Sequence, residues 1–438
     1  MAAQQRTRSC CRERRPQDEG TPHGSKQMCI PMTREIYERI WDDPGEVRRF
    51  LEPLIHTSPE LFPEGMPDGF QLTGRLPESK KMPGVRLRHV RLPNGGVFSL
   101  RPSFVMSYMT GTVEELDHPL LLLSLGVPCW VVTNIFGHHD MYWYRLLERL
   151  GRNSLVGTTV RDPARLPEHL AADEHHTDWC GEKGYVAFTT GAGCVLGVAL
   201  SDSADAEHLT HAYGQFAAES RDVHPHYAPH TINTDGWWAT RNAFRALFST
   251  IVPVLCFLHG FLKIRDRCRN ARTLHDRVWE VYRAATAAEF HERMATCRAW
   301  CQQGPWPKAV LERVTKLWNR ESDYGVSYAH PGCHRTSNLV DRLMNRLTRF
   351  LYAGRGLHGH QSSCERRLRG WALRHNFRPF APHSGEPRPY HSPAHRLNQK
   401  QYHLHWLHNL QVCASLAGGR SPTEKTVGSG SLDPPQAI

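Results

Sequence analysis

Two aspartates occupy positions where carboxylates could hold metal ions. Asp173 follows the apolar residues 170–172 and Asp235 follows residues 232–234, so each comes at the end of an expected strand. Carboxylates at the ends of adjacent strands converge, and two of them can share a pair of Mg²⁺ ions. Such ions activate an attacking water or 3′-hydroxyl and stabilise the leaving oxygen of a phosphodiester displacement. A lone Asp after a strand is more often a cap or turn residue, so only the whole set of acids favours this chemistry.

The elements that must position these acids alternate between strand and helix. Residues 185–190 and 195–200 are β-rich runs joined by Gly191, Ala192 and Gly193, which predicts a hairpin. After it, the periodicity predicts a helix, a short strand, a second helix and a last strand at 204–220, 230–234, 236–248 and 252–257. The fold class is therefore α/β, with a mixed sheet in a catalytic domain over residues 167–380.

The chain after these strands is rich in Arg and lacks strand signals. Apolar residues at helical spacing predict an all-helical insertion over residues 264–330, followed by helices at 337–352 and 361–375. Residues 381–438 are rich in Pro, His, Gly and Ser, and we expect a partly disordered tail there.

Residues 170–377 resemble the RNase H-like catalytic domain of Mutator-like and related bacterial insertion-sequence transposases, which are DDE-type enzymes. The first acid and its hairpin lie in ADEHHTDWCGEKGYVAFTTGAGCVLGVAL, and the second acid lies in INTDGWWATRNAF. The stretch PVLCFLHGFLKIRDR carries a Cys-x-x-His pair at Cys256 and His259, and RTSNLVDRLMNRLTRFL is similar to the family's final helix. The resemblance implies metal-dependent cleavage and strand transfer of DNA.

The third acid is where this sequence departs from the family. Three residues after Asn338, where the family normally has Glu, the chain has Asp341. Aspartate keeps the charge but is one methylene shorter, so it can ligate a metal only if its helix lies slightly closer. Glu321 is the alternative third ligand. We therefore expect Asp173, Asp235 and Asp341 to hold Mg²⁺ or Mn²⁺.

Cys256 and His259 are open to two interpretations. They could form half of a zinc site, but a closed site needs four ligands, and Cys268, Cys297 and Cys301 offer no regular second pair. By resemblance, His259 lies at the catalytic centre, where its imidazole would hydrogen-bond a phosphate or orient a nucleotide, with Cys256 beside it. Structurally, the pair would be a core Cys and a helix-capping His.

Aromatic and basic residues near the acids could contact DNA. Trp237 and Trp238 follow the second acid and could stack an unpaired base, although core packing is the ordinary role of such residues. Arginines follow the Cys-x-x-His pair and the third acid, and some of them should track phosphates rather than form a solvated face: Arg265, Arg342, Arg346, Arg366, Arg367, Arg369 and Arg374.

The region at 29–166 is expected to bind DNA through helices. Within 119–152, one helix at 120–125, a second opened by Pro128 and a third at 141–150 capped by Asp140 fit a helix-turn-helix with Gly137 in the turn. Arg145 and Arg149 would then face phosphates or bases. A plain helical bundle explains the same pattern. Residues 59–93, rich in Pro and Gly, are expected to form loops.

Composition favours a polyanionic partner. The 438 residues include 54 Lys and Arg against 43 Asp and Glu, which gives a formal charge of +11. Residues 1–28 form an expected disordered tail without a signal-peptide core, and thirteen Cys without framework spacing indicate reduced thiols. Gly126, Pro128 and Asn134 interrupt the one stretch that resembles a membrane span.

Together with this composition, the resemblance implies a transposase in the bacterial cytoplasm, associated with the nucleoid. Its partners would be double-stranded DNA, as terminal inverted repeats and target, and further copies of itself; no membrane is expected. Three alternatives stay open: an inactive relative that only binds DNA, an RNase H-like nuclease or resolvase without strand transfer, and a non-enzymatic helical interaction protein.

Overall fold

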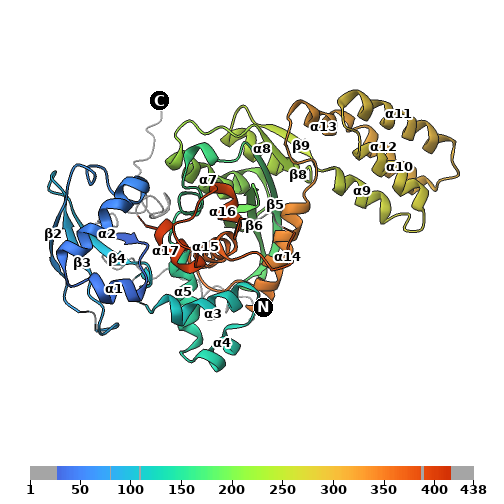
Figure 1. Cartoon of the computed structure of the whole chain (residues 1–438). Coiled ribbons are helices and arrows are strands. Elements are labelled where there is room, and N and C mark those ends of the chain that lie inside the picture. Colours follow the sequence, from blue (N-terminus) through green and yellow to red (C-terminus); the bar gives the residue numbers. More distant parts are fainter. Residues whose placement is uncertain (1–26, 79, 108–109, 386–388, 416–438) are drawn as a thin grey trace, which may run out of the picture.

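The computed structural model describes residues 27–78, 80–107, 110–385 and 389–415. They form a mixed α/β structure with two mixed sheets flanked by helices (Figure 1). One sheet lies in the N-terminal part of the chain. The other is the larger, central sheet, and a helical lobe projects from it.

The central sheet has five strands in the order β7-β6-β5-β8-β9. The strands β5, β6 and β7 are antiparallel, whereas β8 and β9 run parallel to β5. Their bounds are β5 His169–Trp179, β6 Glu182–Gly191, β7 Cys194–Ser201, β8 Thr231–Thr234 and β9 Val252–Leu255. The expected hairpin is confirmed between β6 and β7, where Ala192 and Gly193 both take positive φ. The expected mixed α/β sheet is confirmed with it.

Helices cover both faces of this sheet. On one face, α7 (Ala206–Val223) and α8 (Trp238–Leu247) pack against Ala172 in a buried apolar cluster. On the other, α14 (Asn338–Ala353) and α15 (Gln361–Phe377) pack in a cluster that contains Ala171. Because side chains alternate along a strand, the residues after Ala171 and Ala172 continue to these same two faces.

The region between β9 and α14 is helical, as expected. Its own apolar core is built from residues such as Leu274, Phe290 and Val314. The elements are α9 Phe257–Arg265, α10 Arg272–Tyr282, α11 Ala287–Gln303, α12 Lys308–Trp318, α13 Glu321–Gly325 and the 3-10 turn Val326–Ala329. Helices begin before the expected boundary at residue 264, because α9 follows β9 directly.

The N-terminal region differs from the expectation. It contains a sheet in the order β1-β4-β3-β2, where residues 59–93 were expected to form loops and residues 1–28 a tail. Its elements are β1 Gln27–Ile30, α1 Arg34–Ile40, α2 Pro44–Thr57, the 3-10 turn Pro59–Leu61, β2 Gln71–Arg75, β3 Arg88–Arg91 and β4 Val97–Pro102. The tail boundary at 28 was therefore wrong by two residues; residues 1–26 lie outside the described part.

Three helices follow this sheet, as predicted for residues 119–152. They are α3 (Val113–Ser124), α4 (Cys129–Phe136) and α5 (Asp140–Leu150), with Gly137 at φ 74° in the turn between α4 and α5. His139 caps α5, not Asp140 as expected. Two short elements lead on to β5: α6 Leu155–Thr159 and the 3-10 turn Pro163–Arg165.

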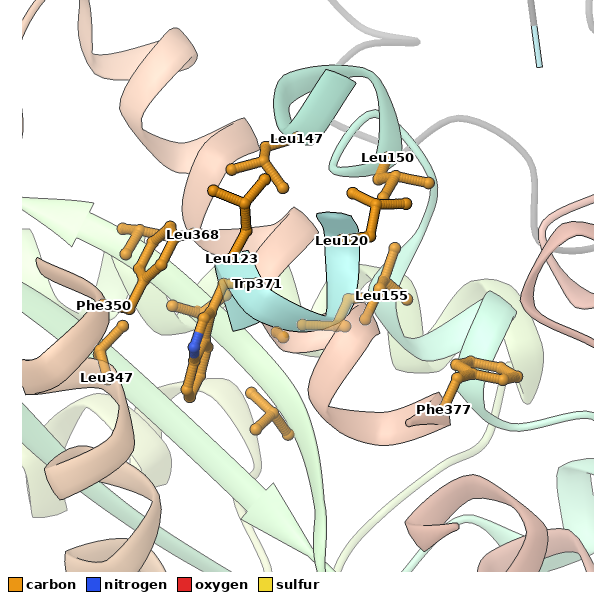
Figure 2. Packing of buried hydrophobic residues seen from close by; sticks show 14 of the residues in the cluster. Leu120, Leu123, Leu147, Leu150, Leu155, Leu347, Phe350, Leu368, Trp371 and Phe377 are labelled. Atoms are coloured by element: carbon orange, nitrogen blue, oxygen red, sulfur yellow. The ribbon is translucent and has the colours of Figure 1, made fainter. Parts of the chain in front are cut away.

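Helix α5 turns its apolar face into the protein core. Leu147 and Leu150 lie beside Leu120 and Leu123 of α3, in the same cluster as Trp371 of α15 (Figure 2). The helices α5 and α15 approach so closely that a Cβ on Gly370 would lie 2.3 Å from the carbonyl oxygen of Leu147. The packing therefore accounts for the buried residues of α5, which are Trp143, Leu146, Leu147 and Leu150.

The C-terminal segment is more ordered than expected. Two helices, α16 (Pro393–Asn398) and α17 (Trp406–Cys413), are largely buried. Leu410 of α17 packs into the central core, whereas Val412 packs into the core of the N-terminal sheet. The prediction of a tail from residue 381 was wrong for these helices; residues 386–388 and 416–438 lie outside the described part.

Candidate metal centre

Asp173, His259 and Asp341 come together at one point. One ligand atom from each lies within 4.8 Å of the other two, the only such group of three or more His, Cys, Asp or Glu in the described part of the chain. The three residues come from β5, α9 and the first turn of α14. All three side chains are half-buried. Sequence reasoning had named each of these residues for the site.

The strand β5 places Asp173 on the face that α14 covers. Asp173 follows Ala171 by two positions and so points to the same face, but β5 continues to Trp179 and does not end at Asp173 as expected. In the parallel pairing of β5 with β8, Ala171 lies opposite Asn233. Asp173, within β5, and Asp235, directly after β8, each follow this pair by two residues.

Asp235 lies beside the cluster but is not one of its three members. It follows the last residue of β8, and its Oδ1 accepts a hydrogen bond of 2.7 Å from the backbone N–H of Trp237. Gly236 between them has a φ of 95°, which favours glycine. Asp235 is near enough to Asp173 for its charge to act on that carboxyl group. The structure thus brings Asp173 and Asp341 together with His259, and the third expected acid, Asp235, lies next to them.

The buried residue Ser337 connects the remaining groups. Its hydroxyl donates to Asp341 Oδ2 at 3.0 Å and lies 3.2 Å from His259 Nδ1. Its backbone N–H donates to the Cys256 sulfur at 3.1 Å, and the thiol and hydroxyl are 3.3 Å apart. Ser337 thus holds the start of α14 against the start of α9. It was missed in the sequence, although it stands inside the quoted final-helix motif directly before Asn338.

The pKa values of three groups in the cluster are shifted by their neighbours. Burial, followed by the charges of Asp235 and Glu174, raises the pKa of Asp173 to about 7. The hydrogen bond with Cys256, followed by the charges of Cys256, Asp341 and Asp173, raises the pKa of His259 to about 9 against its desolvation. Burial works to raise the pKa of Cys256, but its hydrogen bonds with His259 and Ser337 outweigh burial and lower it. Negative charge is therefore crowded at Asp173, and the protonated His259 is a cation beside it.

Glu174 is a second acid that sequence reasoning overlooked. It points to the opposite face of the sheet, where Tyr213 and Thr240 donate hydrogen bonds of 2.5 and 2.7 Å to its Oε1. Burial raises the pKa of Glu174 despite these bonds. Because its neighbours are on α7 and α8, Glu174 ties both helices to the central strand behind the site. In the sequence, the position of Glu174 directly after Asp173 was the signal that could have identified it.

The donor set fits Mg²⁺ or Mn²⁺ better than zinc. Two carboxylates supply hard oxygen ligands, which these ions prefer, whereas the raised pKa of His259 keeps its ring protonated near neutral pH and makes it a hydrogen-bond donor rather than a ligand. Cys256 belongs to no metal-ligand cluster among the described residues, and neither do Cys268, Cys297 and Cys301. Glu321, the alternative third acid, lies in α13 and pairs with His291. The geometry favours Asp341 over Glu321.

The basic residues expected to bind DNA fall into two groups. Arg265, Arg342 and Arg346 are exposed, on α9 and α14. In α15, by contrast, Arg367, Arg369 and Arg374 are buried, and Arg369 forms a buried ion pair with Glu219 of α7. The expectation that these three lie on a solvated or DNA-contacting face was wrong, because α15 is enclosed in the core.

Trp237 and Trp238 remain accessible beside Asp235. They are 46% and 57% exposed, so neither is a core residue. The indole N–H of Trp237 donates to the carbonyl oxygen of Ala204 at 3.1 Å, which fixes one edge of the ring. Their faces are available for stacking.

On α5, Arg145 is exposed and Arg149 half-buried. Tyr142 and Tyr144 on the same helix donate to the carbonyl oxygens of Thr110 and His358. The tyrosines are therefore engaged within the protein, which leaves the two arginines as the candidates for DNA contact on this helix.

No protein-family model matches the chain, and neither does any curated protein sequence. Among the described residues, every helix is too short or too polar to cross a membrane.

Proposed function

We propose that the protein is a DDE-type transposase that cleaves and joins DNA strands with Mg²⁺ or Mn²⁺. The observation that carries the proposal is the convergence of Asp173, His259 and Asp341 within 4.8 Å, with Asp235 at the end of the neighbouring parallel strand. Carboxylates arranged in this way are suited to phosphodiester chemistry.

The architecture supports an RNase H-like catalytic domain. Three antiparallel strands are followed by two that run parallel to the first, in the order β7-β6-β5-β8-β9, with a helix before each parallel strand. This arrangement puts Asp173 on the central strand and Asp235 next to it. The helical segment between β9 and α14 corresponds to the proposed insertion.

Each side chain has a part in the proposed reaction. Asp173 and Asp341 would hold the metal ions with Asp235, and the bound ions would polarise the attacking and leaving oxygens. His259, held by Ser337 and beside Cys256, would donate a hydrogen bond to a phosphate oxygen. Trp237 would stack on a base.

The DNA would follow exposed basic residues. Arg265, Arg342 and Arg346 lie on the two helices that carry His259 and Asp341, and the exposed Arg145 and half-buried Arg149 of α5 are further candidates for phosphate contact. We further propose that the protein acts as a homo-oligomer on DNA in the bacterial cytoplasm.

A strand-joining assay separates this function from its alternatives. A labelled oligonucleotide with a free 3′-hydroxyl, taken from the DNA that flanks the gene, is incubated with protein, Mg²⁺ and a supercoiled plasmid. A transposase links the label to the plasmid. A nuclease cuts the DNA without joining it, and an inactive DNA-binding relative does neither.

A further inference from the structure

A cavity of about 70 Å³ lies between Asp235 and the helical insertion. Four cationic side chains line it: Lys263, Arg313, Lys316 and Arg320. Asp235 is the one acid among the lining residues. The helices α9 and α12, with Arg320 after α12, thus present a concentrated positive charge to Asp235, beside the metal centre.

The positions of the cations follow from three neighbouring elements. Lys263 stands on α9, one turn after His259, and α12 carries Arg313 and Lys316 three residues apart, which puts both on one face of the helix. Arg320 follows α12. Its guanidinium lies over Gly236, where an added Cβ would be 2.9 Å from Nη1.

Apart from Asp235, which lines the same cavity, most of this positive charge has no acidic partner. Arg320 donates to Asp323 at 3.1 Å, an acid that also lies 3.7 Å from Arg241. Among the described residues, Lys263, Arg313 and Lys316 take part in no ion pair. Four like charges that face one carboxylate repel one another, so a further anion in the cavity would relieve the repulsion.

The size of the cavity limits the anion. A water-sized group needs roughly 10–15 Å³ of such space, so the cavity has room for about five heavy atoms, the number in a phosphate group. Guanidinium and ammonium groups are the side chains that bind phosphate oxygens most strongly.

We propose that this cavity is a phosphate-binding subsite. It would take one phosphate of a DNA strand adjacent to the phosphodiester that reacts at Asp173 and Asp341, and so align the strand across the site. The assignment of the cavity to a DNA strand rests on the proposed function. The same cationic side chains would also bind a free phosphate. The cavity would give the insertion a role in catalysis through positioning.

The test compares two double variants with equal loss of charge. Arg313→Ala/Lys316→Ala removes two lining cations, whereas Arg283→Ala/Lys308→Ala removes two exposed cations of the insertion that do not line the cavity. Circular dichroism and thermal melting check that each variant folds. If the first variant does not fold, Lys316→Glu replaces it, because Lys316 is exposed at the rim.

Two measurements are made without divalent metal, so that neither depends on cleavage. Broadening of the ³¹P line reports binding of inorganic phosphate, and fluorescence anisotropy gives DNA affinity across a salt series. In the lining variant we expect phosphate binding to weaken by about tenfold. The slope of log affinity against log salt should fall by about 0.9 for duplex DNA. The control variant should match the wild type in phosphate binding.

The outcomes distinguish a phosphate of a DNA strand from a free phosphate as the ligand of the cavity. A change in the DNA slope assigns the subsite to a strand phosphate, and loss of inorganic phosphate binding alone assigns it to a free phosphate. Lining and control variants that behave alike in both measurements would overturn the subsite. If the wild type never cuts DNA while the lining variant still loses phosphate binding, the proposed function fails and the subsite stands.

Discussion

Asp173 on the central strand and Asp341 at the start of α14 bring carboxylate oxygens within 4.8 Å of each other, although they are far apart in the sequence. Only the packing of α14 on β5 creates this relationship. Ser337 maintains it, because its hydroxyl donates to Asp341 and its backbone N–H donates to Cys256.

The first prediction concerns the third acid. Asp341→Asn should abolish cleavage while folding and DNA binding remain, because a neutral amide cannot balance the charge of divalent ions. Asp341→Glu should retain cleavage, since it keeps the carboxylate and lengthens it by one methylene. Strand cleavage in Mg²⁺ and in Mn²⁺ measures both. Glu321→Gln is the control, and an inactive Glu321→Gln beside an active Asp341→Asn would make Glu321 the ligand.

The second prediction concerns stability. The folded pKa of Asp173, about 7, lies above its ordinary value, so ionising this group costs the folded state stability as pH rises from about 4 through 7. Asp173→Asn should therefore stabilise the metal-free protein by at least about 1 kcal/mol at pH 8, and much less at pH 4. Thermal melting at both pH values measures it, with the exposed Asp276→Asn as control. An unchanged melting temperature at pH 8 would contradict the charge crowding.

A third prediction concerns acid sensitivity. Burial, together with Arg378 and Arg346, lowers the pKa of His375 to about 3. A lowered His pKa contributes stability that is present above about 6.5 and is lost as pH falls below it, because the unfolded chain then takes up the proton. His375→Gln should lose less melting temperature between pH 7 and pH 5 than the wild type does. The exposed His360→Gln should behave like the wild type, and equal losses in all three proteins would refute the role of His375.

A fourth prediction tests the helix-turn-helix interpretation of α5. Arg145→Ala/Arg149→Ala should flatten the salt dependence of DNA binding by about 0.9 per lost phosphate contact, without loss of stability. The control is Arg39→Ala/Arg91→Ala in the N-terminal sheet region, where both residues are exposed. Trp143→Ala should instead destabilise the fold by about 3–5 kcal/mol, because this side chain is fully buried. An unchanged salt slope would leave α5 as a structural helix.

The central sheet and its flanking helices were predictable because their signals are local. The hairpin at Ala192 and Gly193, the strand before Asp235 and the helix that carries Asp341 all follow from short-range periodicity and turn residues. The convergence of Asp173, His259 and Asp341 was available only through resemblance, because no local pattern links β5 to α14. Ser337 and Glu174 were missed for the same reason: their roles depend on partners distant in sequence.

The N-terminal sheet could not be predicted from the sequences of its strands. β1 has four residues and pairs in parallel with β4, so its partner lies far along the chain. β2 is largely exposed and contains Gly74, which hides any alternation of polar and apolar residues. Asn94 and Gly95 between β3 and β4 were a hairpin signal that the surrounding Pro and Gly residues obscured. The buried helix α17 likewise depends on two cores that meet only in the folded chain.

Metal-dependent cleavage of a supercoiled plasmid that carries the gene's flanking DNA tests the central claim most directly. The wild type should convert the plasmid to nicked or linear forms in Mg²⁺ or Mn²⁺ and leave it intact in EDTA. Asp173→Asn should bind the same DNA and cut none of it. Equal cleavage by the wild type and Asp173→Asn, or no cleavage by the wild type in either metal, would contradict the assignment of Asp173 and Asp341 to a phosphoryl-transfer centre.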